Sequence, residues 1–151
     1  LGLFHSTAFA DSEEKKATRR KGMDFIRQHG SSEFLQATSP NLFSAKTRAQ
    51  KPGEVAEFID NLSNFSPTAL VSYYEAMIKR PDRIEVLKDS HLPILFIMGE
   101  HDMAVPLQDS LKLCPLPEKA YIHILHESGH MGMLEEPEKS NWILDNFLSD
   151  T

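Results

Sequence analysis

Two polar groups, each a few residues after an apolar run, carry the residue types of an acid and a base. Gly99-Glu100-His101-Asp102 follows one run, and Ser128-Gly129-His130 follows the next. An imidazole that acts as a general base near neutral pH needs a carboxylate to fix its tautomer and to stabilise the imidazolium that forms. Asp102 and His130 fit these roles, and they would be two members of a catalytic triad whose nucleophile is not evident in the chain.

The segments that must position this pair have the pattern of buried parallel strands. Residues 93–98 are apolar without interruption, as expected of a strand buried on both faces, and Gly99 ends the run. Residues 121–125 are predicted to form the second strand. Reactive groups gather beyond the carboxyl ends of parallel strands, and both Asp102 and His130 have that position.

A short helix is predicted between the two strands. Pro106 has a first-turn position, residues 107–113 form the helix, and Pro115 and Pro117 stop it. The resulting strand–helix–strand unit places the chain in the α/β class.

The chain from Leu92 to about Phe147 resembles the closing part of the α/β-hydrolase family. That family's pattern is an apolar strand, Gly-x-x-Asp, Val-Pro, a second strand, Ser-Gly-His and a final amphipathic helix, here from Leu134 to Leu148. The residues that match it are Gly99, Asp102, Val105, Pro106, Gly129, His130, Glu136 and Pro137. The resemblance implies that Asp102 is the triad acid and His130 the triad base, after a nucleophile that comes earlier in the chain order.

The resemblance does not extend to the nucleophile. In the family a Gly-x-Ser-x-Gly turn joins a strand to a helix, and this chain has no such motif. Gly30-Ser31-Ser32-Glu33-Phe34 comes nearest, but Phe34 stands where a small residue is needed, and the segment lies between two helical patterns. Leu1-Gly2-Leu3-Phe4 opens on an apolar run without an initiator Met. We therefore expect the C-terminal portion of a longer hydrolase, without the nucleophile and the oxyanion-hole amides, and inactive alone.

The resemblance implies a partial α/β-hydrolase fold in three parts. Residues 1–7 would be the end of a core strand, residues 8–90 a helical lid (cap), and residues 91–151 the C-terminal part of the core with the last parallel strands and the final helix. The first lid helix is predicted to begin with Asp11 as its cap and Glu14 reaching back to it.

Other reactive side chains fit structural roles better than catalytic ones. Cys114 lies at the end of the predicted helix, where packing is its expected role, and Ser128 is too near His130 in the chain to act as its nucleophile. Glu100, Asp109 and Asp11 are weaker alternatives to Asp102.

The histidines do not form a metal-binding pattern. His123 and His126 are three positions apart, so in a strand they would point to opposite faces. The remaining ones, His5, His29, His91 and His101, carry no usable pattern. No metal or organic cofactor is expected.

Composition and charge limit the partners. The chain has 151 residues, 40% hydrophobic and 25% charged, with a net charge of −6, which argues against nucleic acid or an anionic membrane as the main partner. Its basic run over residues 15–21 shares its predicted helix with Glu13, Glu14 and Asp24, which predicts a solvated helix face. No apolar stretch reaches the ~20 residues of a membrane span. A small-molecule substrate in the cytoplasm is expected, with self-association possible through an exposed sheet edge.

The leading hypothesis is an esterase-like serine hydrolase that cleaves a small acyl ester through an acyl-enzyme intermediate. If the nucleophile were an Asp, the same base would serve dehalogenation or epoxide opening. A third hypothesis is a non-catalytic ligand-binding protein on a hydrolase scaffold, since fold does not fix function.

Overall fold

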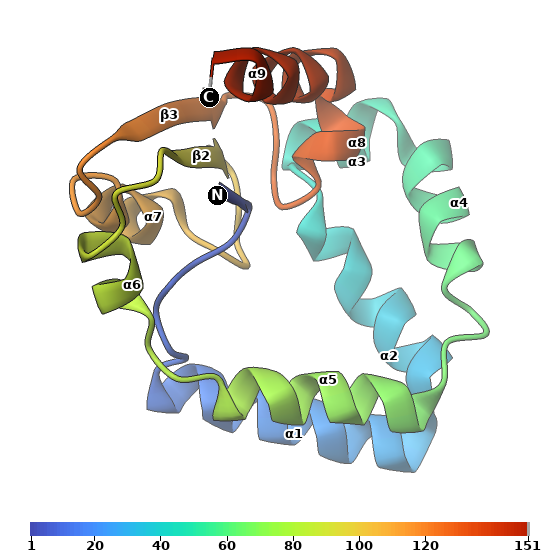
Figure 1. Cartoon of the computed structure of the whole chain (residues 1–151). Helices are drawn as coiled ribbons and strands as arrows, with labels where there is room; N and C mark the ends of the chain where they lie inside the picture. Colours follow the sequence, from blue (N-terminus) through green and yellow to red (C-terminus); the bar gives the residue numbers. More distant parts are fainter. Residues whose placement is uncertain (151) are drawn as a thin grey trace. The chain divides into compact units, whose positions relative to one another are not determined.

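The computed structural model describes residues 1–150, which divide into two compact units (Figure 1). Unit 1 comprises Leu1–Ala8, Asn41–Pro52 and the chain from Arg83 onward. Unit 2 comprises Phe9–Pro40 and Gly53–Asp82. Each unit has its own core and is described by itself.

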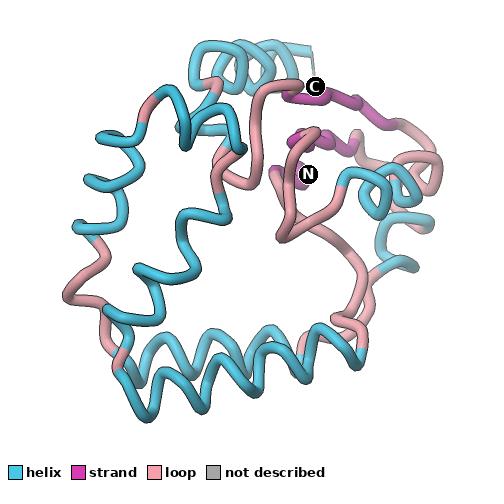
Figure 2. Tube along the Cα trace, turned by 180° about the vertical axis from the view of Figure 1, so that it is seen from behind, coloured by secondary structure: helices cyan, strands magenta, loops and turns pink. Residues whose placement is uncertain are grey.

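Unit 1 contains the strands and the helices that pack on them. Its elements are β1 (Gly2–Phe4), α3 (Ala45–Gln50), α6 (Ile84–Lys88), β2 (Ile94–Gly99), α7 (Leu107–Leu113), β3 (Ala120–Leu125), α8 (Gly132–Glu135) and α9 (Pro137–Asp150). The strands form one parallel sheet in the order β1-β2-β3 and lie side by side in Figure 2. The predicted α/β class is therefore confirmed, and β2, α7 and β3 form the predicted strand–helix–strand unit.

The core of unit 1 follows from the alternation of side chains along β2. Leu95 and Ile97 point to one face of the sheet, where they pack with Leu125 of β3 and with Ile143 and Phe147 of α9. Every residue of β2 is buried, as the uninterrupted apolar run predicts for the central strand of a covered sheet.

Unit 2 is helical. It contains α1 (Glu13–His29), α2 (Ser31–Thr38), α5 (Pro67–Lys79) and nearly all of α4 (Pro52–Asn61), and a short 3-10 helix, η1 (Ser39–Leu42), leads from unit 2 into unit 1. Its core contains Ile26, Phe34 and Leu70, one residue from each of α1, α2 and α5. Gly30, with φ +88°, separates α1 from α2, in a conformation that glycine adopts readily.

The predicted cap of the first helix is wrong by one residue. Ser12, and not Asp11, caps α1, because its Oγ accepts the N–H of Lys15. The Asp11 carboxylate instead forms ion pairs with Arg19 and Arg80.

One further boundary differs from the predicted one. The single final helix expected from Leu134 to Leu148 is two helices, α8 and α9, because the residue before Pro137 is disfavoured in helical conformation. Within the range predicted for the lid, residues 41–52 and 83–90 group with the sheet in unit 1. Within residues 1–150, no helix combines the length and the apolar composition needed to cross a membrane.

Candidate active site

Asp102 lies in the turn that follows β2, at the carboxyl end of the strand. Its Oδ1 accepts the backbone N–H groups of Ala104 and Val105, each at 2.8 Å. These bonds hold one carboxylate oxygen in the turn, in the manner of an Asx turn, and leave Oδ2 for side-chain donors.

His130 lies in the loop between β3 and α8, and its Nδ1 is 2.8 Å from Oδ2 of Asp102. Its backbone N–H donates to the carbonyl of Leu42 at 2.7 Å, which fixes the loop. The Asp102 side chain is 1% exposed and that of His130 is 27% exposed, so the ring is the member open to solvent. With Nδ1–H donated to Asp102, the neutral ring has its lone pair on Nε2, the atom that can accept a proton.

Asp102 is held in its charged form. Burial alone would raise the pKa of Asp102, but hydrogen bonds from His130 and His5 and from the Val105 N–H outweigh it, so the pKa lies well below its usual value. The carboxylate is therefore available at neutral pH to stabilise an imidazolium on His130.

His5 is a site residue that was not identified from the sequence. Its ring is buried, its Nδ1 is 3.2 Å from Oδ2 of Asp102, and its Nε2 accepts the N–H of Gly132 at 3.2 Å. The signal that could have found it is the one that identified Asp102 and His130, a polar residue that follows an apolar run within a few positions. His5 directly follows such a run at the end of β1.

Glu135 of α8 organises the loop that carries His130. Its Oε1 accepts the N–H groups of Gly129 at 2.8 Å and Met131 at 3.3 Å. Its Oε2 accepts the N–H of Ser44 at 2.8 Å and the hydroxyl of Thr47 at 2.7 Å. One carboxylate thus joins the His130 loop to the first turn of α3.

The side chains considered as rivals have other partners. Ser128 is fully buried, and its Oγ donates to the Glu136 carboxylate at 2.6 Å. Glu100 pairs with His126 at 2.6 Å. Cys114 is buried, and its thiol lies 3.5 Å from the Ser110 carbonyl, in agreement with a packing role.

His5, Asp102 and His130 are also the group, among residues 1–150, whose ligand atoms could hold a metal ion, since these atoms lie within 4.8 Å of one another. A metal ion bound by Asp102 and both Nδ1 atoms would have to replace the hydrogens through which His5 and His130 contact Asp102. Both distances to Oδ2 are those of hydrogen bonds, and the Nε2 of His5 already accepts from Gly132. The arrangement therefore fits a hydrogen-bonded acid–base group.

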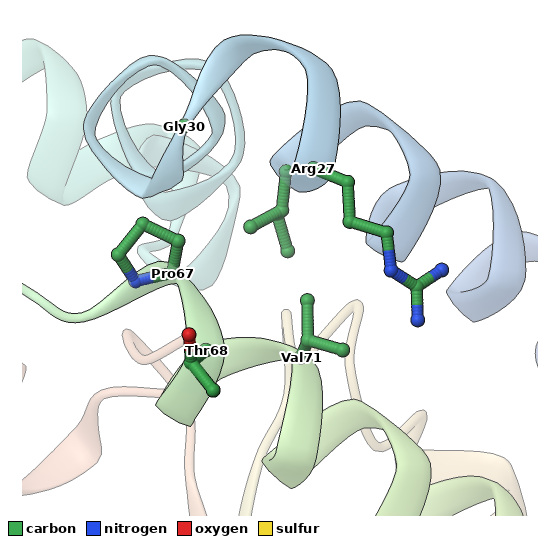
Figure 3. A pocket seen from close by; sticks show the side chains of 6 residues that line it. Arg27, Gly30, Pro67, Thr68 and Val71 are labelled. Carbon is green, nitrogen blue, oxygen red and sulfur yellow. The ribbon is translucent and has the colours of Figure 1, made fainter.

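Unit 2 has a separate open hollow of about 380 Å³ between the end of α1 and the first turns of α5 (Figure 3). It is lined by Ile26, Arg27, Gly30, Pro67, Thr68 and Val71. The charge of Arg27 is balanced by Asp24 and Glu75, so the lining offers no acid–base pair for chemistry.

Comparison with known proteins gives partial relatives. No protein-family model matches the chain. Human protein ABHD8 is 35% identical over 57 residues, which is 38% of this chain and 13% of that protein.

Solved structures match nearly the whole chain. A thermophilic esterase from Thermogutta terrifontis has a TM-score of 0.90 at 21% identity, over 99% of this chain and 55% of that one. MGS-M2, an alpha/beta hydrolase enzyme from a Medee basin deep-sea metagenome library, has a TM-score of 0.86 at 17% identity. The match covers 99% of this chain and 56% of MGS-M2. The chain thus spans about half the length of these structures, and at such identity the likeness concerns the fold.

Proposed function

Because this chain has the α/β-hydrolase fold, we propose that the protein it belongs to hydrolyses a small acyl ester, with Asp102 and His130 as the acid and base of its triad. The observation that carries the proposal is the 2.8 Å contact between Nδ1 of His130 and Oδ2 of Asp102, at the carboxyl ends of adjacent parallel strands. The likeness to a thermophilic esterase favours an ester over other acyl bonds. The nucleophile, a serine, would come from a segment outside these 151 residues.

The proposed reaction follows from the state of each group. Nε2 of His130 takes the proton of the serine hydroxyl as its oxygen bonds to the ester carbonyl carbon. The imidazolium then gives this proton to the leaving alkoxide, and an acyl-enzyme remains. In the second half, Nε2 takes a proton from water, whose oxygen attacks the acyl carbon, and returns it to the serine oxygen. Asp102 keeps the ring in the Nδ1–H tautomer and balances its charge.

We also propose that unit 2 is the lid of this hydrolase. Its residues lie in the chain between β1 and β2, which are neighbours in the sheet, so unit 2 is an insertion between two adjacent core strands. Its helices are separated at Gly30 and before Pro67, and such breaks can serve as hinges that let lid helices move while the sheet stays fixed.

The test is ester turnover by the full-length protein. With p-nitrophenyl acetate and butyrate, we expect His130→Ala to lower kcat by about 10²- to 10⁴-fold. His126→Ala is the matched control, since this exposed histidine lies near the same loop but pairs with Glu100, and its kcat should stay near that of the wild type. Equal turnover by His130→Ala and the wild type would overturn the assigned base.

The type of nucleophile is tested separately with a fluorophosphonate. A stable adduct on a serine, formed by the wild type and strongly reduced in His130→Ala, supports acyl-enzyme chemistry. Dehalogenase or epoxide-hydrolase turnover without an adduct would assign an Asp nucleophile. Specific ligand binding without any turnover by the folded full-length protein would favour the non-catalytic hypothesis.

A further inference from the structure

Asp102 has a second histidine on the oxygen that faces His130. The Nδ1 atoms of His5 and His130 lie 3.2 Å and 2.8 Å from the same Oδ2. The side chain of His5 is 2% exposed, so water does not readily replace its contact with Asp102. A buried carboxylate oxygen with two ring donors cannot rotate without losing both.

The hydrogen bonds of His5 define its tautomer. Nε2 accepts the N–H of Gly132 at 3.2 Å, and an acceptor nitrogen carries no hydrogen. The hydrogen of the neutral ring is therefore on Nδ1 and points at Asp102. A protonated His5 would place an N–H against the N–H of Gly132, so this environment matches the neutral ring.

The backbone and the neighbouring rings fix the position of His5. Its φ is +45°, a left-handed conformation that few non-glycine residues adopt, and its N–H donates to the Ile97 carbonyl at 2.9 Å. Its ring stacks on Phe4 at 5.0 Å and meets the edge of the His130 ring at 5.7 Å. The side chain is thus placed by β1 and held against both members of the acid–base pair.

We propose that His5 is a positioning residue: its Nδ1–H holds the Asp102 carboxylate in the orientation that keeps the Nε2 lone pair of His130 free for the reaction. The proposal rests on the function proposed above. A neutral donor suits this task, because a cation in the place of His5 would repel the imidazolium that forms on His130. His5 itself transfers no proton.

Two substitutions separate the two hydrogen bonds of His5. The amide nitrogen of His5→Asn can take the place of Nδ1 and donate to Asp102, and Asn tolerates a positive φ. The amide oxygen of His5→Gln can take the place of Nε2 and accept from Gly132, but its nitrogen does not reach Asp102 in that orientation. In the full-length protein we expect His5→Asn to keep kcat within a few-fold, and His5→Gln to lose about 10- to 100-fold in kcat with little change in KM. The reverse order would overturn the proposal and assign His5 only to anchoring α8.

Ring-¹⁵N histidine NMR of the full-length protein gives a readout that does not depend on turnover. In the wild type we expect His5 as the neutral Nδ1–H tautomer, and a downfield Nδ1–H proton for His130 that persists in His5→Asn and weakens in His5→Gln. His5 as the Nε2–H tautomer or as a cation at pH 7 would overturn the proposal without any variant. The expected spectra without ester turnover would refute the proposed function and leave the hydrogen bonding of His5 established. Ester turnover that is unaffected in both variants would support the proposed function and refute the positioning role of His5.

Discussion

Gly99 lies so close to Gly129 that a side chain at position 99 would overlap the backbone: a Cβ there would be 2.0 Å from the carbonyl oxygen of Gly129. Gly129 is confined in turn, since a Cβ on it would lie 2.7 Å from the carbonyl oxygen of Leu42. These close approaches let the turn after β2 stack on the loop after β3. The same stacking brings Nδ1 of His130 to 2.8 Å from Oδ2 of Asp102.

Gly99→Ala should therefore separate the acid from the base. The added methyl meets backbone atoms that cannot move aside independently, so we expect a loss of about 1–3 kcal/mol in the free energy of unfolding. A shift of about 1 Å in the His130 loop would lower kcat by about 10²-fold. Chemical denaturation and ester turnover of the full-length protein measure the two effects.

Gly53→Ala is the control for this substitution. Gly53 lies in α4, and no atom is within 4 Å of the position of its Cβ. Alanine in a helix should raise the stability by about 0.5–1 kcal/mol and leave kcat unchanged. A Gly99→Ala protein with the stability and activity of the wild type would show that the close approach to Gly129 is not required.

Glu135→Gln should loosen the loop of His130. The wild-type carboxylate accepts from Gly129, Met131, Ser44 and Thr47, and an amide would turn a donor toward at least one of these donors. We expect the free energy of unfolding to fall by about 1.5–3 kcal/mol, and kcat to fall more than KM rises. Thermal unfolding and steady-state kinetics measure these effects.

Glu138→Gln, at an exposed position of α9, is the matched control and should change neither quantity. If Glu135→Gln behaved like this control, the four hydrogen bonds of Glu135 would have no part in holding His130.

Local patterns were enough to predict the strands, the crossover helix and the proximity of Asp102 to His130. The apolar run before Gly99 is short, uninterrupted and ended by glycine, and it forms β2 with its predicted burial. The proximity of Asp102 and His130 could be predicted because each lies a few residues past a predicted strand, and parallel strands end at the same edge of a sheet. The resemblance to the α/β-hydrolase family, which depends on these residues, is confirmed at the level of the fold.

The contribution of His5 could not be predicted in the same way. It lies 97 positions from Asp102, and the two meet because β1 pairs with β2 in the register Phe4↔Ile97. Nothing local in the sequence states which strands are neighbours or in which register. The role of Glu135 could not be predicted for the same reason, since its hydrogen bonds to Ser44 and Thr47 join segments about 90 positions apart.

Asp102→Asn should change how stability depends on pH. The pKa of the folded-state carboxyl lies below the unfolded-state value of about 3.9, so its ionisation contributes stability that is fully present above about pH 4 and is lost as the pH falls further. An amide cannot ionise, and its NH2 group must face either the rings of His130 and His5 or the backbone N–H groups of Ala104 and Val105. We expect Asp102→Asn to be less stable by about 1.5–3 kcal/mol at pH 7, with a gap that narrows below about pH 4. Denaturation at several pH values measures this gap.

Asp11→Asn separates this effect from catalysis. Burial alone would raise the pKa of Asp11, but its hydrogen bond and charge interactions with Arg19 and Arg80 outweigh it and lower the pKa. The difference in free energy of unfolding between the wild type and Asp11→Asn should also narrow as the pH falls, while kcat stays near that of the wild type. Asp102→Asn, in contrast, should lose kcat as well. A gap for Asp102→Asn that widens as the pH falls would contradict the lowered pKa of Asp102.

The 151-residue chain, prepared alone, should self-associate and show no ester turnover. β1 is an edge strand, and it uses the carbonyl of Leu1 and the N–H of His5 to pair with β2. By the alternation of a parallel ladder, the backbone groups of Gly2 and Phe4 point away from β2 and offer a template for another chain. We expect the mass measured by light scattering to rise with protein concentration. Gly2→Pro should make this rise smaller, because proline removes an N–H that points away from β2. A monomer at every concentration would rule out association through this edge, and ester turnover by the isolated chain would show that the reaction needs no nucleophile from elsewhere.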